Sequence, residues 1–145
     1  KSSAASDVYK RQPEELKKLY TVKLLIQPLA ENSIYHGIKE SDRKGTILIT
    51  AGEEPGGFYL CVRDDGLGIS QETLTILNAD LKRGVTVSDG GYGIFNVNER
   101  IRLYFGRDYG LELRSCTGEW TEAVIHLPKY IPERTEWDVS DFDRR

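Results

Sequence analysis

A carboxylate, an amide, a phenol and an imidazole lie within six positions of one another, at Glu31, Asn32, Tyr35 and His36. The surrounding stretch 23–37, KLLIQPLAENSIYHG, is otherwise mostly apolar and is typical of a helix. At about 100° per residue, the four polar side chains fall on one arc of that helix. We therefore predict that this arc faces a ligand while another side of the helix packs into a core.

Metal binding and proton transfer are the chemistry that this arc offers. The amide of Asn32 supplies a neutral oxygen, which suits Mg²⁺ when a triphosphate contributes the other ligands and most of the charge. Glu31 has a carboxylate that can orient or deprotonate an attacking group. Taken alone, a buried amide bonded to a strand explains Asn32 equally well, while a solvated acid is the usual role of a helical glutamate such as Glu31 and packing or hydrogen bonding the usual role of a histidine such as His36.

A second cluster, Asp64-Asp65-Gly66-Leu67-Gly68, follows an apolar run that is typical of a strand. The two glycines allow a tight turn and a close approach of the backbone to a ligand. The carboxylate of Asp64 can accept a hydrogen bond from an exocyclic amine such as that of adenine, and it would reject the carbonyl of guanine. An ordinary turn is the alternative for this motif in isolation.

A third cluster, Gly91-Tyr92-Gly93, opens directly into an amphipathic stretch that begins at Ile94. Amide groups at the start of a helix bind anions, because their N–H groups are exposed and the helix dipole is positive there. The stretch is not a dinucleotide fingerprint, since a third glycine and a preceding strand are missing. Each cluster alone is a weak signal, and their order along the chain is the specific one.

The elements that must position these clusters alternate between helical and extended patterns. Residues 1–12 are Ser/Ala-rich and are expected to be a disordered or non-native leader, 13–129 a single domain, and 130–145 a charged tail. Helices are expected at 22–39, 71–79 and 93–105, strands at 46–51, 58–63, 110–115 and 120–127, and a mobile loop at 80–91. The fold class is therefore α+β, with a mostly antiparallel mixed sheet and helices on one face. In the first helix, Ile26, Ala30 and Ile34 are the predicted core stripe.

Composition excludes several classes of function. The net charge of −3 argues against broad nucleic-acid binding, which needs a basic surface. The chain has no apolar run of the length that spans a membrane. Its two cysteines are too few for a disulfide framework and are expected to be reduced thiols in or near the sheet.

With these motifs, the chain resembles the ATP-binding domain of sensor histidine kinases of the LytS/YesM type, within the GHKL superfamily. The stretch 24–38, LLIQPLAENSIYHGI, is similar to the family's N box, LLLQPLVENAIKHGI. The stretch 62–69, VRDDGLGI, is similar to the G1 box VxDNGxGI, and 91–106, GYGIFNVNERIRLYFG, to the G2 box. The resemblance implies a Bergerat-type two-layer α/β sandwich that binds ATP and Mg²⁺ under a lid.

The resemblance also implies roles for individual residues. Asn32 matches the Mg²⁺ ligand, Asp64 the carboxylate that reads adenine, and Glu31 the general base of the ATP-hydrolysing branches. The other nucleotide-binding residues that it implies are His36, Gly66, Gly68, Ile69, Lys82, Arg83, Gly91, Tyr92, Gly93, Ile94, Asn96 and Thr121. Among these, Gly66 and Gly68 shape the adenine pocket, Gly91 and Gly93 border the phosphates, and Asn96 supports the phosphate end.

Two departures from the family pattern affect the expected charge of the pocket. Tyr35 stands where the family often has a lysine that faces the phosphates, and Lys82 or Arg83 in the expected lid is the candidate replacement. Asp65 stands in place of an asparagine and is expected to add a negative charge near the pocket.

The implied function is that of the catalytic ATP-binding domain of a two-component sensor histidine kinase. Such a domain donates the γ-phosphate to a histidine on a dimerisation helix, from which a response regulator receives it. That helix, and the family's leading strand, are expected to be missing from this chain. The full-length protein is expected to be a membrane-anchored homodimer with this domain in the cytoplasm. The alternatives are an anti-sigma-factor-type serine kinase and a degenerate nucleotide-binding regulatory module.

Overall fold

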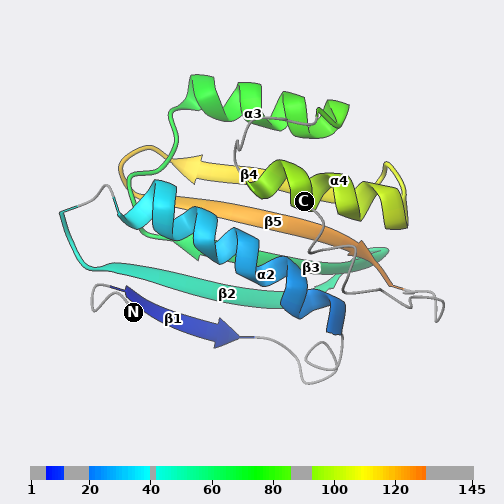
Figure 1. The fold of residues 1–145 in the computed structure, drawn as a ribbon, viewed down its shortest axis with the longest axis horizontal. Helices are drawn as coiled ribbons and strands as arrows, with labels where there is room; N and C mark the ends of the chain where they lie inside the picture. Colours follow the sequence, from blue (N-terminus) through cyan, green and yellow to red (C-terminus); the bar gives the residue numbers. More distant parts are fainter. Residues whose placement is uncertain (1–5, 12–19, 40–41, 86–92, 130–145) are drawn as a thin grey trace.

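A computed structural model of the chain describes residues 6–11, 20–39, 42–85 and 93–129. The elements, in chain order, are β1 (Ser6–Arg11), α2 (Tyr20–Asn32), the π-helical turn η1 (Ser33–Ile38), β2 (Gly45–Glu54), β3 (Gly57–Asp64), α3 (Gln71–Arg83), α4 (Gly93–Phe105), β4 (Gly110–Cys116) and β5 (Trp120–Pro128). The strands form one sheet in the order β1-β2-β3-β5-β4. Figure 1 shows α2 and α4 lying across one face of this sheet, with α3 next to β4. The predicted α+β class, with helices on one face of a mixed sheet, is confirmed.

The first strand corrects the expectation for the N-terminal residues. Ser6–Arg11 pair in parallel with the first half of β2, whereas the other strand pairs are antiparallel. The sequence SDVYKR lacks a regular apolar alternation, so it gives no strand signal, and the pairing is provided by the edge of β2. The chain therefore does contain a strand ahead of α2, contrary to the expectation that the leading strand is missing. Residues 1–5 and 12 lie outside the described residues.

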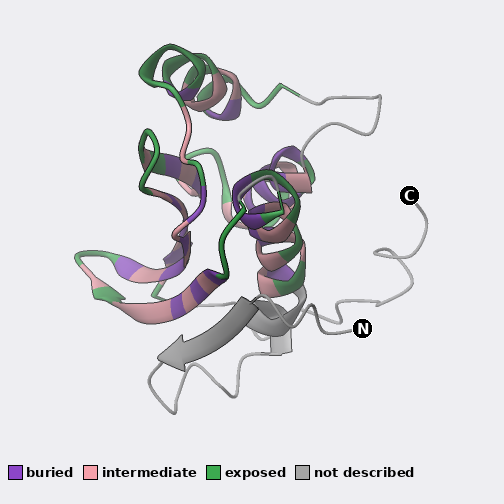
Figure 2. Cartoon of the chain, turned by 90° about the vertical axis from the view of Figure 1, so that its left-hand side faces the viewer, coloured by how far each residue is buried: buried purple, intermediate pink, exposed green. Residues whose placement is uncertain are grey.

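The hydrophobic core lies between the sheet and the helices, and its contact with α2 differs from the predicted one. Leu25 and Leu29 are 1% and 0% exposed, whereas Ile26, Ala30 and Ile34 are only half-buried. Both sets of positions repeat every four residues, so periodicity alone could not choose between them. Figure 2 shows the resulting layers, with exposed positions on the outer side of α3.

Pro28 does not interrupt α2, although proline lacks the N–H that a helix interior uses for hydrogen bonding. The helix runs through it and changes form only after Asn32, where six residues adopt π-helical geometry. Single π-helical turns are rare and are often found at functional sites. Here the turn carries the motif residues that follow Asn32.

Helix α3 is four residues longer than the sequence predicted. Ser70 caps its start by accepting a hydrogen bond from the Thr73 N–H at 3.3 Å, and Gly84 ends it in the left-handed conformation with φ of 72°. Lys82 and Arg83 consequently belong to its last turn instead of the loop. The helix continues to the glycine because Leu81, Lys82 and Arg83 are all good helix formers.

Two asparagines join the helices to the exposed edge of β4. The amide of Asn78 exchanges two hydrogen bonds with the backbone of Leu113, of 2.8 and 2.9 Å, as a neighbouring strand would. Asn98, which is 2% exposed, donates to the Leu81 carbonyl and accepts from the Leu111 N–H, each at 2.9 Å. These bonds satisfy the backbone groups of Leu111 and Leu113 that β4, as an edge strand, leaves without a strand partner, and one of them also reaches a carbonyl in the last turn of α3.

Replacing Asn98 is therefore expected to destabilise the fold. Asn98→Ala leaves the buried Leu111 N–H without its partner and removes one of the donors to the Leu81 carbonyl, which still accepts from the Gly84 N–H, so it costs about 1–3 kcal/mol in the free energy of unfolding. Asn96→Ala is the matched control on the same helix, because Asn96 is exposed. Urea denaturation of both variants measures the difference. Equal free energies of unfolding would contradict the bridging role of Asn98.

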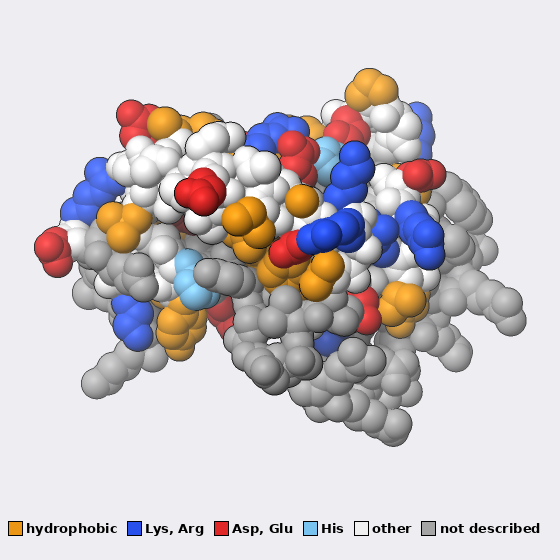
Figure 3. Space-filling model, turned by 90° about the horizontal axis from the view of Figure 1, so that it is seen from above, with side chains coloured by type: hydrophobic (Ala, Val, Ile, Leu, Met, Phe, Trp, Pro, Cys, Tyr) orange, Lys and Arg blue, Asp and Glu red, His pale blue; other side chains and the backbone are white. Residues whose placement is uncertain are grey.

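Charged side chains of both signs are interspersed on one face of the molecule (Figure 3). Figure 3 shows Lys and Arg beside Asp and Glu on the face seen from above. Within the part of the chain that the structure describes, no helix has the length and apolar character to cross a membrane.

Candidate functional site

A cavity of about 330 Å³ lies where η1, the end of β3 and the first turns of α3 and α4 converge. It brings together residues from all three motifs, which are between about 25 and 60 positions apart in the chain. Its lining comprises Asn32, His36, Gly37, Asp64, Gly68, Ile69, Ser70, Thr73, Leu77, Ile94, Leu113 and Thr121. Seven of these twelve are site residues that the sequence had predicted.

Asp64, the last residue of β3, is a carboxylate almost wholly removed from solvent, with 2% of its surface exposed. The Gly66 N–H donates to its Oδ1 at 3.0 Å, and the Ser33 hydroxyl also donates to the carboxylate. Burial is the largest effect on this carboxylate and raises the pKa of Asp64. The two hydrogen bonds lower this pKa, and the nearby negative charge of Asp65 raises it. A buried acceptor that borders a cavity can select a donor on a bound ligand.

Glycine is required at two positions where backbone segments meet beside Asp64. A Cβ at Gly37 would lie 2.4 Å from Asp64 Oδ1, and a Cβ at Gly66 would lie 2.1 Å from the Gly37 carbonyl oxygen. The Leu67 N–H closes this contact by donating to the same carbonyl at 3.1 Å. The π-helical turn thus presses Gly37 against the glycine-rich loop, a role that the sequence did not single out.

The tip of the β4–β5 hairpin holds the other end of the glycine-rich loop. The Ile69 N–H donates to Ser115 Oγ at 2.7 Å, and Thr117 Oγ1 donates to the Ile69 carbonyl at 2.9 Å. The Gly118 N–H donates to the Leu67 carbonyl at 2.6 Å. Sequence reasoning missed these residues, because they lie about 50 positions from the loop and carry no motif of their own.

Asn32 borders the cavity with an unsatisfied oxygen. Its Oδ1 is buried and has no hydrogen-bond partner among the described residues. Leaving such an acceptor unpaired costs about 1–3 kcal/mol, which a bound cation or donor offsets. An amide oxygen is also a ligand type that Mg²⁺ accepts. Within the described residues, no group of three His, Cys, Asp or Glu side chains could hold a metal, so phosphate and water oxygens would have to supply the other ligands.

Several predicted residues lie away from the cavity. Glu31 is exposed and accepts a hydrogen bond from the Gln27 side chain at 3.1 Å. Asn96 is exposed on α4, one position from the buried side that faces the core. Lys82 and Arg83 line a separate cavity beside Arg102 and Arg107, and Arg83 forms an ion pair with Asp80. The structure thus does not bring these four residues to the predicted site.

The predicted glycines that do not line the cavity lie close to it or outside the described residues. Gly66 lies directly behind the cavity wall, against Gly37. Gly93 begins α4, where an added Cβ would meet only the Pro28 side chain at 3.9 Å. Gly91 and Tyr92 lie outside the described residues. Of the predicted anion site, the structure therefore describes only the start of α4 at Gly93.

Asp65 and Tyr35, the two residues that depart from the family pattern, both lie outside the cavity lining. Asp65 Oδ1 accepts from the Thr46 N–H at 2.7 Å, so its carboxylate is bonded at the start of β2 and does not line the cavity, but its negative charge lies near enough to raise the pKa of Asp64. Tyr35 is 59% exposed, and the Lys39 ammonium lies 5.1 Å from the centre of its ring. A lysine thus stacks on the tyrosine that replaces the family's lysine.

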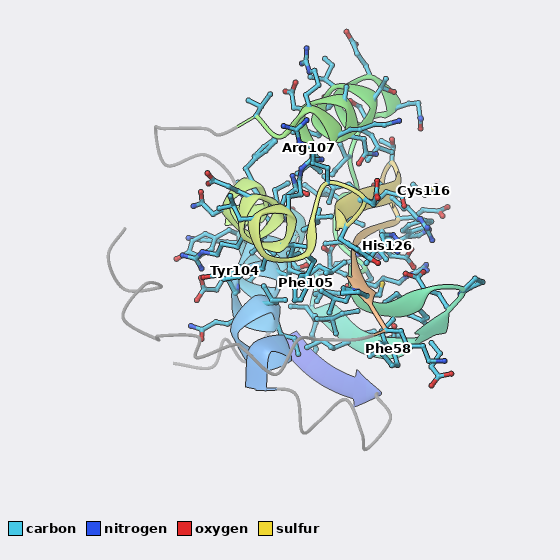
Figure 4. The ribbon with its side chains drawn as sticks, turned by 90° about the vertical axis from the view of Figure 1, so that its right-hand side faces the viewer. Phe58, Tyr104, Phe105, Arg107, Cys116 and His126 are labelled. Atoms are coloured by element: carbon cyan, nitrogen blue, oxygen red, sulfur yellow. The ribbon has the colours of Figure 1, made fainter. Side chains whose placement is uncertain are left out.

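The two histidines and two cysteines are well separated by the fold. His36 borders the cavity, whereas His126 is on the sheet face away from the helices, 2.8 Å from Glu54 Oε1 (Figure 4). Both cysteines are free thiols in the sheet, as predicted, with Cys61 buried and Cys116 exposed. Burial, with a smaller effect of the Glu122 charge, raises the pKa of Cys61 to about 11, so this thiol is protonated at neutral pH.

Comparison with solved structures defines the fold. The catalytic domain of the histidine kinase ThkA superposes with a TM-score of 0.59 and 15% identity, covering 86% of this chain and 79% of that one. The histidine kinase domain of a blue-light activated kinase from Erythrobacter litoralis gives 0.56 and 17%, covering 87% of this chain and 52% of that one. The chain therefore has the two-layer fold of histidine kinase catalytic domains.

Sequence comparison then gives the family. Residues 20–131 match the model of the histidine kinase-, DNA gyrase B- and HSP90-like ATPases, and the chain belongs to this family. Sensor histidine kinase YesM of Bacillus subtilis (strain 168) is 35% identical over 115 residues, which is 79% of this chain and 18% of YesM. Sensor histidine kinase YpdA of Escherichia coli (strain K12) is 34% identical over 105 residues, and Sensor protein LytS of Bacillus anthracis 29% over 124. These matches cover 72% and 85% of this chain, and the chain spans about a fifth of the length of these relatives.

Proposed function

We propose that the cavity binds ATP together with Mg²⁺ and that the chain is the catalytic part of a sensor histidine kinase. The observation that carries this proposal is the pairing of a buried carboxylate, Asp64, with an unsatisfied amide oxygen, Asn32, on one cavity in this ATPase family. Asp64 accepts a hydrogen bond from the adenine amine. Asn32 is the protein ligand of the metal.

Different residues of the cavity would contact the base, the metal and the phosphates. Ile69, Leu77 and Ile94 offer apolar contacts to a purine ring, which gains by leaving water. The fixed backbone around Gly37 and Gly66 holds the Asp64 carboxylate in place before the ligand arrives, so little order is lost on binding. Bound Mg²⁺ supplies charge neutralisation at the phosphates. The N-terminal end of α4, at Gly93, offers exposed N–H groups to the same phosphates.

In the full-length protein, the domain donates the γ-phosphate to a histidine on a dimerisation helix that lies outside this chain. Neither histidine of this chain suits that role, since His36 borders the cavity and His126 is engaged by Glu54 on the opposite face of the sheet. The phosphoryl group then passes to a response regulator. A homodimeric, membrane-anchored kinase with this domain in the cytoplasm completes the proposal.

Two measurements test this proposal. Calorimetry with ATP, with and without Mg²⁺, is expected to show binding that Mg²⁺ strengthens. Transfer of radiolabel from ATP is expected for the full-length protein and not for this chain alone. No binding of ATP would contradict the nucleotide site.

The same measurements separate the two alternatives. ATP binding with transfer to a serine of a partner protein would favour an anti-sigma-factor-type serine kinase. ATP binding without any transfer would favour a regulatory module. The named relatives are sensor histidine kinases and sensor proteins, and they give these alternatives no support.

A further inference from the structure

Three polar residues form a row across the sheet at the cavity. Asp64 on β3 is the register partner of Thr121 on β5, and Thr121 is the register partner of Ser115 on β4. Asp64 and Thr121 border the cavity and are 2% and 8% exposed. Ser115 is half-buried and lies next to Thr121 without bordering the cavity itself. Its hydroxyl therefore reaches a ligand only through Thr121.

The hydrogen bonds of Ser115 determine where its single proton lies. A serine hydroxyl has one proton to donate and two lone pairs to accept with. Ser115 Oγ lies 2.7 Å from the Trp120 carbonyl oxygen, which can only accept, so the proton is directed there. One lone pair accepts the Ile69 N–H at 2.7 Å. Only one lone pair then remains.

That remaining lone pair faces Thr121. The two hydroxyl oxygens, Ser115 Oγ and Thr121 Oγ1, are 3.3 Å apart, and either could be the donor by distance alone. Because Ser115 has already given its proton to Trp120, Thr121 must donate in this contact. The Thr121 hydroxyl is then left with lone pairs only, which it can present to a ligand in the cavity.

We propose that Ser115 is a positioning residue for base selection, because it fixes the Thr121 hydroxyl as an acceptor. Thr121 and Asp64 then present only acceptors to a purine. An exocyclic amine has two N–H donors and satisfies such a pair, whereas the carbonyl of a 6-oxo purine would oppose acceptors on both sides and leave N1–H as the donor on that edge of the ring. The inference rests on the proposed function, and it adds the residue that determines how strictly a 6-amino purine is preferred over a 6-oxo purine.

The test compares ATP with inosine triphosphate, which carries a carbonyl in place of the amine, by calorimetry on the full chain. In Ser115→Ala the Thr121 hydroxyl is released and can turn its proton toward a carbonyl. The ratio of the two dissociation constants is therefore expected to fall about tenfold, the effect of one relieved polar mismatch. Ser115→Thr keeps a hydroxyl and is expected to restore the ratio. In a Thr121→Val background, Ser115→Ala is expected to leave the ratio unchanged.

A purely structural role would give a different pattern. If Ser115 only holds the loop through Ile69, its replacement weakens both nucleotides equally and the ratio stays constant, which overturns the inference. A change in the ratio that persists in the Thr121→Val background also overturns it, because the effect would not pass through Thr121. Failure of the unaltered chain to bind ATP would instead refute the proposed function, so the two failures are distinguishable.

Discussion

Asp64→Asn is expected to abolish tight ATP binding while making the folded chain more stable at neutral pH. The amide of asparagine lacks the charge of the carboxylate, and loss of a charged hydrogen bond to the adenine amine lowers ATP affinity by about 10- to 100-fold. The fold gains because a neutral amide is less costly to bury than a carboxylate with 2% exposure. Calorimetry measures the first effect and urea denaturation the second.

The stability difference between Asp64→Asn and the parent chain is expected to depend on pH. Burial raises the pKa of Asp64 in the folded chain above its value in the unfolded chain. The folded state thus binds more protons, so the stability that Asp64 contributes is present below the unfolded pKa and is lost as the pH rises through the folded pKa. The stability advantage of Asp64→Asn is therefore expected to be small in acid and to grow as the pH rises through that window.

Asp65→Asn is the matched control for this variant. Asp65 is the adjacent carboxylate, and its Oδ1 accepts from the Thr46 N–H away from the cavity. ATP affinity is expected to change little, because an amide oxygen can accept the same bond. If Asp64→Asn and Asp65→Asn bind ATP equally well, the assignment of Asp64 as the residue that reads the base is wrong.

Asn32→Ala is expected to lose the contribution of Mg²⁺ to ATP binding. The variant removes the buried Oδ1 that has no partner among the described residues, and with it the proposed protein ligand of the metal. With Mg²⁺ present, ATP affinity is expected to fall by about 10-fold or more, since removing one polar contact to a charged group has that effect. In the presence of a chelator, the variant and the parent chain are expected to bind ATP alike.

Glu31→Ala is the neighbouring control for the metal site. Glu31 is exposed and accepts from Gln27, so its removal is expected to leave Mg²⁺-dependent ATP binding unchanged. A loss in Glu31→Ala as large as that in Asn32→Ala would show that the helix end, and not the amide oxygen, controls binding. Equal Mg²⁺ dependence in Asn32→Ala and the parent would remove Asn32 from the metal site.

The motifs predicted the centre of the site because local chemistry and chain order sufficed there. Asp64 ends a clearly apolar strand, and Gly68 has a φ of 69° in a loop that the sequence marks by its glycines. Thr121, which the family resemblance implied, borders the cavity next to Asp64. These residues follow from patterns of fewer than ten positions.

The remaining features depend on contacts between distant segments, which no local pattern contains. Strand β1 exists through pairing with β2, and its own sequence has no strand period. Lys82 and Arg83 belong to α3 because the helix continues to Gly84, so the cations expected in a lid lie elsewhere. The role of Ser115 depends on hydrogen bonds to Ile69 and Trp120 across the hairpin and the loop.

The prediction of which face of α2 packs into the core was wrong for a different reason. Leucines and isoleucines alternate around this helix, so Leu25 and Leu29 compete with Ile26 and Ile34 for the core on equal terms. The sheet decides in favour of the leucines, since both are at most 1% exposed. That rotation leaves Asn32 half-buried at the cavity and Glu31 in solvent, which separates two residues that the sequence had treated as one polar pair.

A crystal structure of the chain with Mg²⁺ and a non-hydrolysable ATP analogue tests the central claim most directly. We expect the adenine amine within hydrogen-bonding distance of Asp64 and the metal bound to Asn32 Oδ1. We also expect the base to lie against Ile69 and Ile94, which border the same cavity. A nucleotide bound in the separate cavity beside Lys82 and Arg102, or a base whose amine contacts neither Asp64 nor Thr121, would contradict the account.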